Sequence, residues 1–168
     1  PGCYLIQSPK DTAKTGLLVD MAKEHLKGLT TLHTAHRTAL VDSIAFRHGC
    51  YSSNDMMPDM QTQHEVFATC LPSILNQIID GQLRQIDVIT LDEIEQMLSA
   101  LFAPELKHKR LQIFSTLVAL IRQATYVYAL DADASEVAYQ FLKFCRDDVT
   151  VIINDYRDTS RKFRKFKS

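Results

Sequence analysis

The feature that most constrains this chain is a run of mostly apolar residues from Leu111 to Leu130. Within it, apolar residues recur at steps of three and four, the spacing of one helix face: Phe114, Leu117, Ile121, Ala124 and Tyr128. Further apolar residues flank that face, so we expect a helix buried among other elements. The run is long enough to cross a bilayer, but Arg122 and two glutamines interrupt it, and we expect no transmembrane segment.

Start and stop signals divide the rest of the chain into further helices. Ser8-Pro9 predicts a helix that begins there and continues to about residue 48, where Gly49 ends it. A second helix is expected to end at Asp80-Gly81. Thr90 and Glu93 have the spacing of a capping box, which predicts the start of a third helix. Asp133 and Glu136 have the same spacing before a fourth helix.

The predicted connections between these helices are short, about four to nine residues, and short connections join antiparallel neighbours. The sequence therefore predicts an all-α fold, an antiparallel up-down-up-down bundle of four long helices. The third helix should be kinked or broken at Pro104. Residues 1–168 are expected to form one domain with a basic C-terminal tail at 157–168, since the length and the 46% hydrophobic content are those of an ordinary globular domain.

The four cysteines, Cys3, Cys50, Cys70 and Cys145, show none of the CxxC spacing of zinc or redox motifs. Cys70 and Cys145 fall on apolar faces of the predicted helices, where cysteine acts as a small buried hydrophobe. No glycosylation sequon supports secretion. We expect reduced thiols, which favours the cytoplasm, although the sequence leaves the compartment open. The chain begins at Pro1 without a methionine, as a fragment or a processed product would.

Four histidines are expected to point into the bundle. His25, His33 and His36 share one arc of the first predicted helix, and His64 lies among apolar residues of the second. Such a group could bind a metal, haem or another ligand, or it could consist of buried imidazoles that are hydrogen-bonded within the core. Helical metal sites also need inward carboxylates in Glu-x-x-His spacing, and none of these four histidines has a glutamate at that spacing. We therefore predict neither a metal nor a cofactor.

The tail interleaves cations with aromatic rings. Six of the chain's 19 basic residues and one of its 20 acidic residues lie in 157–168. Such a segment can bind an anionic partner, whether a lipid surface, a nucleic acid or an acidic protein. The candidate partner-binding residues are Arg157, Arg161, Lys162, Phe163, Arg164, Lys165, Phe166 and Lys167. The alternative is a solvated helix end.

The sequence shows no catalytic signature. There is no GxSxG, no HExxH and no glycine-rich phosphate loop among its five glycines. We therefore predict a non-catalytic interaction or regulatory module that binds a protein partner. Two alternatives stay open: a ligand-, haem- or metal-binding sensor that uses the histidines, and a secreted four-helix cytokine.

Overall fold

The computed structural model describes residues 1–9, 16, 27–48, 51–52 and 65–154. These residues are organised around a seven-stranded sheet in the order β3-β4-β2-β7-β8-β1-β9, in which every neighbouring pair is parallel. The strands are β1 (Gly2–Gln7), β2 (Thr31–Ala35), β3 (Tyr51–Ser52), β4 (Val66–Cys70), β7 (Val88–Asp92), β8 (Tyr126–Asp131) and β9 (Val149–Ile153). The fold is therefore α/β, and the predicted all-α four-helix bundle is wrong.

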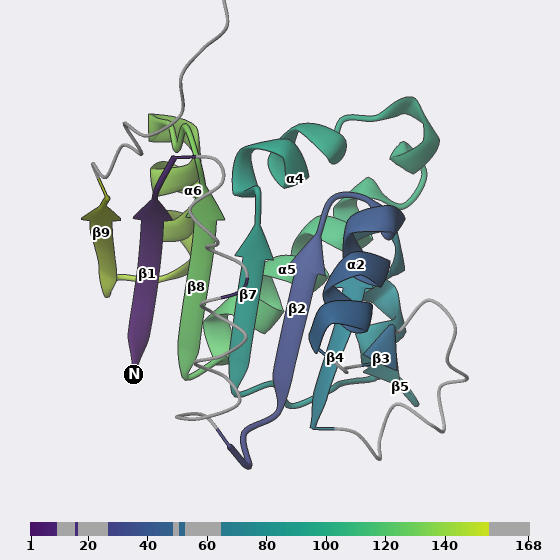
Figure 1. Cartoon of the computed structure of the whole chain (residues 1–168). Coiled ribbons are helices and arrows are strands. Elements are labelled where there is room, and N and C mark those ends of the chain that lie inside the picture. Colours follow the sequence, from purple (N-terminus) through teal and green to yellow (C-terminus); the bar gives the residue numbers. More distant parts are fainter. Residues whose placement is uncertain (10–15, 17–26, 49–50, 53–64, 155–168) are drawn as a thin grey trace, which may run out of the picture.

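Helices cover both faces of this sheet (Figure 1). Helix α2 (Thr38–His48) packs on one face, against β2 and β4. The other face carries η1 (Leu71–Gln77), α4 (Ile94–Ala100), α5 (Arg110–Gln123) and α6 (Glu136–Cys145), with the short η2 (Pro104–Leu106) between α4 and α5. The larger part of the core lies between these helices and the sheet, where alternate strand residues such as Leu32, Ile89 and Val127 are fully buried.

The run from Leu111 to Leu130 is half helix and half strand. Its first part is α5, as predicted, with Leu117 and Ile121 in the core. Its second part, Tyr126–Asp131, is the central strand β8. A parallel strand covered on both faces is apolar at nearly every position, and such a run also satisfies a helical spacing. The aromatic residues of β8 and its place between β7 and β1 favour the strand.

The other predicted helices also contain strands in the structure. Within the first, the described residues include β2 and α2, and within the second they form β4, η1 and β5. Thr90 lies inside β7, so the capping box at Thr90 is wrong. Pro104 opens η2 instead of kinking a long helix. The short connections did not establish an antiparallel helical bundle, because connections of the same length also join a strand to the helix that crosses back over its sheet.

Asp80-Gly81, predicted as a helix end, is instead a hairpin turn. It joins β5 (Ile78–Ile79) to β6 (Gln82–Leu83), and Asp80 and Gly81 have φ values of 51° and 75°. Two positive φ angles define the turn type that matches the twist of paired strands, and Asp-Gly is a favoured sequence for it. Asp-Gly is a turn signal both at a helix end and in a hairpin. The flanking residues, which here form the paired strands β5 and β6, decide which turn forms.

The C-terminal part of the predicted fourth helix also divides into a helix and a strand. Helix α6 buries Ala138, Phe141, Leu142 and Cys145 as expected, and the Ser135 side chain caps it by accepting a hydrogen bond from the Val137 N–H. The residues after Cys145 turn back to form β9, at the edge of the sheet. Ile152 is 44% exposed there, and Val151 and Ile153 are also exposed.

Among the described helices, none has the length and apolar character needed to cross a membrane.

We expect Leu117→Ala or Ile121→Ala to lower the free energy of unfolding by about 2–5 kcal/mol, because each truncation removes a fully buried side chain and leaves a cavity. Leu111→Ala on the same helix is the matched control, since Leu111 is 82% exposed and its loss should change stability by less than about 0.5 kcal/mol. Urea unfolding of the three variants measures the difference. Equal losses at Leu111 and Leu117 would contradict this assignment of the buried face.

The described part of the chain contains three cysteines, Cys3, Cys70 and Cys145. All three are buried, and none of them forms a disulfide bond. Burial raises the pKa of Cys3 to about 12 and that of Cys145 to about 11. Because only the thiolate reacts, we expect both to resist alkylation in the folded chain at pH 8 and to react rapidly once urea unfolds it. Mass spectrometry after a timed pulse of iodoacetamide, with and without urea, tests this. Rapid labelling of Cys3 in the folded chain would contradict it.

Candidate functional site

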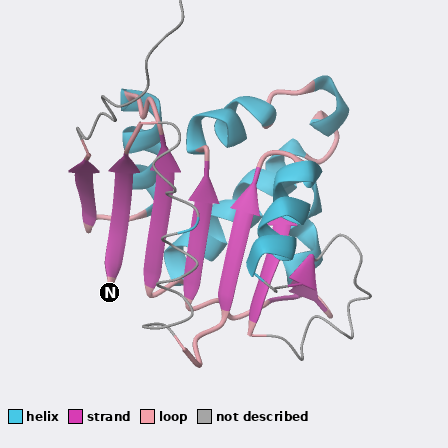
Figure 2. Ribbon diagram, viewed as in Figure 1, coloured by secondary structure: helices cyan, strands magenta, loops and turns pink. Residues whose placement is uncertain are grey.

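The carboxyl ends of the parallel strands meet along one edge of the sheet, where the arrowheads point in Figure 2. From β1 the chain continues to β2, on one side of β1, whereas from β8 it continues through α6 to β9, on the other side. The connections that leave the adjacent strands β1 and β8 therefore run in opposite directions along the sheet. In open α/β sheets, ligands bind outside the carboxyl ends of the strands at such a switch point. This position directs the search for a site to the residues that end β1, β7 and β8.

Two consecutive carboxylates end β7. Asp92 is its last residue and is 7% exposed. Glu93 follows with φ 55° and ψ 59°, a left-handed conformation that is rare for a residue other than glycine. This conformation costs an L-residue roughly 1–2 kcal/mol. Backbone strain of this kind is concentrated at functional sites, where the surrounding structure holds it in place.

The turn between β2 and α2 brings a histidine to Glu93. The Nδ1 atom of His36 lies 3.4 Å from Oε2 of Glu93, and the two side chains are 11% and 39% exposed. The chain after β2 and the chain after β7 therefore meet at the Glu93 carboxylate. Sequence analysis had placed His36 in a helical bundle, and the structure places it at the edge of the sheet.

Asp131, which ends β8, serves a different purpose. One of its carboxylate oxygens accepts a hydrogen bond from the Glu95 N–H and the other from the Asp133 N–H, each at 3.0 Å. The Glu95 carboxylate in turn accepts hydrogen bonds from the backbone N–H and the hydroxyl of Ser135, at 2.8 and 2.5 Å. These bonds fasten the start of α4 to the connection between β8 and α6. Asp131 is therefore a structural clamp.

The chain leaves β1 at Ser8, which is buried beside Asp131. Its N–H donates to the Asp131 carbonyl at 3.0 Å, and its hydroxyl accepts a hydrogen bond from the Asn154 amide at 3.0 Å. The sequence that starts here, SPKDTAKT from Ser8 to Thr15, has the length and the Lys-Thr ending of the phosphate-binding signature GxxxxGK[ST]. Ser8 and Ala13 stand where the signature has glycine. That signature belongs between a strand and a helix, and here β1 precedes it and Gly16, directly after it, is helical.

Sequence reasoning missed this pair of segments. The search for a phosphate loop required glycines. In the sequence from Ser8 to Thr15, serine and alanine stand at the two glycine positions of the signature. The second segment, Asp92-Glu93, was hidden because Thr90 and Glu93 also fit a capping box. The usable signal was the combination of a short apolar run before Lys14-Thr15 and a second apolar run before Asp92-Glu93.

The predicted histidine group does not form a common site. His33 lies in β2, where its Nδ1 atom is 2.8 Å from the Thr90 hydroxyl and the ring is 2% exposed. Of the remaining candidates, His36 lies at the edge, while His25 and His64 are outside the described residues. Within the described ranges, no group of three or more His, Cys, Asp or Glu residues could hold a metal ion. The predicted partner-binding residues at 157–167 also lie outside the described part, so that prediction stays untested.

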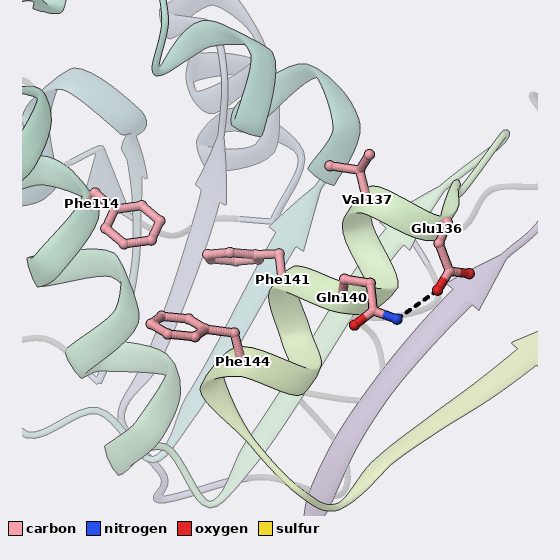
Figure 3. Close-up of a pocket in the computed structure, with 6 residues that line it drawn as sticks. All are labelled: Phe114, Glu136, Val137, Gln140, Phe141 and Phe144. Atoms are coloured by element: carbon pink, nitrogen blue, oxygen red, sulfur yellow. Dashed lines mark hydrogen bonds between the residues drawn. The ribbon is translucent and has the colours of Figure 1, made fainter.

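An apolar pocket lies away from this edge, between α5 and α6 (Figure 3). Phe114, Phe141 and Phe144 form most of its wall, and the rings of Phe114 and Phe144 are 6.3 Å apart. Its one carboxylate, that of Glu136, accepts a hydrogen bond from Gln140 at 2.6 Å. A pocket with this lining lacks the paired polar groups that catalysis requires, so the candidate site remains the edge of the sheet.

Comparison with known proteins gives a family and a set of related folds. The model of the family described as origin of replication binding protein matches residues 33–165. The replication origin-binding protein of Psittacid herpesvirus 1 is 24% identical over 162 residues, which cover 89% of this chain and 18% of the viral protein. The chain thus spans about a fifth of the length of that curated relative.

Solved helicase structures share the fold. The helicase domain of Hef from Pyrococcus furiosus superposes with a TM-score of 0.67 at 16% identity, over 91% of this chain and 35% of that one. A hypothetical ATP-dependent RNA helicase from Sulfolobus tokodaii gives 0.66 at 11% identity, over 91% and 48% of the two chains. The UvsW helicase of bacteriophage T4 gives 0.60 at 9% identity, over 90% and 54%. At these identities the likeness establishes the fold alone.

These findings overturn the predicted function. A helical-bundle interaction module, a histidine sensor bundle and a four-helix cytokine all required an all-α fold, and the family match points to replication instead.

The strain at Glu93 can be measured. We expect Glu93→Gly to be more stable than Glu93→Ala by about 1 kcal/mol, because only glycine adopts the left-handed conformation without a steric cost. At Gln96, an exposed residue inside α4, the order should reverse, since glycine costs about 1 kcal/mol relative to alanine in a helix. Thermal unfolding of the four variants checks both signs. The same order at both positions would show that Glu93 is not strained.

Proposed function

The chain belongs to the family of origin-of-replication binding proteins, and on that premise we propose that it is a domain that binds and hydrolyses a nucleoside triphosphate to act on DNA at an origin. The observation that carries the proposal is the placement of Ser8 and of Asp92-Glu93 at one edge of the sheet. Strand β8 separates the two strands that end there, β1 and β7, and the switch point lies beside β1. A triphosphate bound outside that edge would lie beside the sequence that resembles a phosphate loop.

The roles of the residues follow from their chemistry. In a phosphate loop, backbone N–H groups surround the phosphates and the lysine reaches the outer ones, which assigns that role to Lys14. The threonine hydroxyl and a carboxylate that ends another strand at the same edge are the usual protein ligands of Mg²⁺ in such sites, which assigns Thr15 and Asp92. Both are hard oxygen donors, as Mg²⁺ prefers. When bound, Mg²⁺ would neutralise part of the charge on the phosphates.

Glu93 is the candidate for orienting the attacking water. It follows Asp92 directly and immediately precedes the helix that begins at Ile94, whose N-terminus its side chain does not cap. The His36 imidazole, 3.4 Å away, restricts where the carboxylate can lie. A carboxylate so held can accept a hydrogen bond from water and take its proton as the water attacks phosphorus.

The replaced glycines favour a second candidate function. A Cβ atom at residue 8 or 13 hinders the close approach of the backbone to phosphate that glycine permits. A chain of this family that no longer binds a nucleotide would act on the origin through DNA binding alone. The two functions differ in one measurable property, which is nucleotide affinity.

Nucleic acid is the anionic partner that the family favours over a lipid surface or an acidic protein. The basic tail at 157–168 remains a proposed contact for it.

We expect the chain to bind ATP in the presence of Mg²⁺ and to release phosphate. Lys14→Ala should remove binding, because it deletes the cation nearest the outer phosphates. Glu93→Gln should retain binding and slow phosphate release by about 10²–10⁴-fold, the usual contribution of a general base. Fluorescent-nucleotide titration and a phosphate-release assay measure the two effects.

The matched control is Glu136→Gln on α6, an exposed carboxylate that contacts only Gln140 among the described groups. It should change neither quantity. Absence of nucleotide binding by the unmodified chain would favour the DNA-binding alternative. Phosphate release that survives Glu93→Gln would remove Glu93 from the proposed role. Binding is the primary readout, because the chain covers only 18% of its relative's length and turnover can require the remainder.

A further inference from the structure

An exposed aromatic residue stands on the connection between α4 and α5. We call residues 101–110 the Phe102 loop. Phe102 is 73% exposed, whereas the residue before it, Leu101, is buried in the core. Figure 1 shows this loop beyond the carboxyl ends of the strands, at the same end of the molecule as the candidate site.

The Phe102 loop is held rigidly. Arg110 Nε donates to the Leu101 carbonyl at 2.6 Å, and its Nη2 atom donates to the Phe102 carbonyl at 3.2 Å. The same guanidinium lies 5.4 Å from the centre of the Phe102 ring. Backbone hydrogen bonds from Phe102 to Ser99 and from Leu106 to Ala103 close the loop internally. The ring is therefore presented in a fixed position, and a ligand that contacts it has little conformational entropy to remove.

Two lysines follow this ring in the same loop. Lys107, His108 and Lys109 are consecutive and exposed, and Glu105 is the one acid of the loop. Neither of the two ion pairs found among the described residues involves these cations. Their charges face solvent, as they would for a phosphate backbone.

From these contacts we propose that the Phe102 loop is a contact site for single-stranded DNA. One base stacks on the ring of Phe102, and Lys107 and Lys109 bind the adjacent phosphates. Aromatic rings beside cations recognise single strands in this way because every base has a π face, so the contact tolerates any sequence. A protein partner is less favoured, because lysines are depleted from the cores of protein interfaces. The proposal rests on the proposed action on DNA.

The test measures binding of a fluorescently labelled oligothymidylate to the full chain by anisotropy. We expect Phe102→Ala to weaken binding by roughly tenfold, within the range found for losing one stacked base. Phe102→Trp should preserve binding because indole also stacks, and Phe102→Leu should weaken it as alanine does. Replacing Lys107 and Lys109 by alanine should make the negative slope of log K against log salt shallower by about 1.4, since each phosphate contact contributes about −0.7 for single strands.

Phe144→Ala is the matched control. Phe144 is 59% exposed and has the Arg122 guanidinium 5.3 Å from its ring, so it repeats the chemistry of Phe102 at the opposite end of α5. About 18 Å of helix separates Arg110 from Arg122. Phe144→Ala should leave DNA binding unchanged. Phe102 is 73% exposed, so Phe102→Ala should keep the thermal unfolding of the parent chain.

Each remaining outcome decides the proposal. Equal binding by the Phe102→Ala and Phe144→Ala variants would overturn it. A Phe102→Leu variant that binds the oligonucleotide as tightly as the parent would also overturn it, because leucine is apolar but has no ring on which a base can stack. An unmodified chain that fails to bind the oligonucleotide would remove both this proposal and the action on DNA. ATP binding is the independent readout: it should be unchanged in Phe102→Ala, so loss of the stacking site leaves the proposed nucleotide site standing.

Discussion

Parallel hydrogen bonding between the strands is the constraint on which the rest of this structure depends. Each parallel pair requires the chain to cross back over the sheet, and these crossings place α2 on one face and α4, α5 and α6 on the other. The same pairing gathers the ends of β1, β7 and β8 along one edge. Ser8, Asp92 and Asp131 are distant in sequence, and the parallel pairing brings the strands that carry them into register.

The sequence could predict part of the helical content but not the sheet. Helices α5 and α6 have one buried stripe each, and the periodicity of Leu117, Ile121, Phe141 and Cys145 identified their buried faces. Strand β8 is buried at almost every residue, so Val127, Ala129 and Leu130 offered no alternation by which to recognise it. Pairing partners also lie far apart in the chain, as Thr90 and Tyr128 do, and no local pattern records them.

The site was harder to predict than the fold. The usual marker of a phosphate loop is glycine, and Ser8 and Ala13 remove it. The strained backbone at Glu93 leaves no trace in the sequence, because glutamate is not a residue that signals a left-handed turn. Histidine spacing suggested a shared face for His33 and His36, yet a strand end separates them, so that His33 contacts Thr90 in the core and His36 contacts Glu93 at the edge.

The edge strand β9 has a practical consequence for handling the protein. Its five residues, Val149–Ile153, contain neither a charge nor a proline, and three of the apolar side chains are exposed. No described strand pairs with its outer side, so that side offers backbone donors and acceptors to any extended segment that approaches it. Edge-to-edge pairing between copies grows with concentration. A lysine in place of Val151 would act as the gatekeeper that the strand lacks.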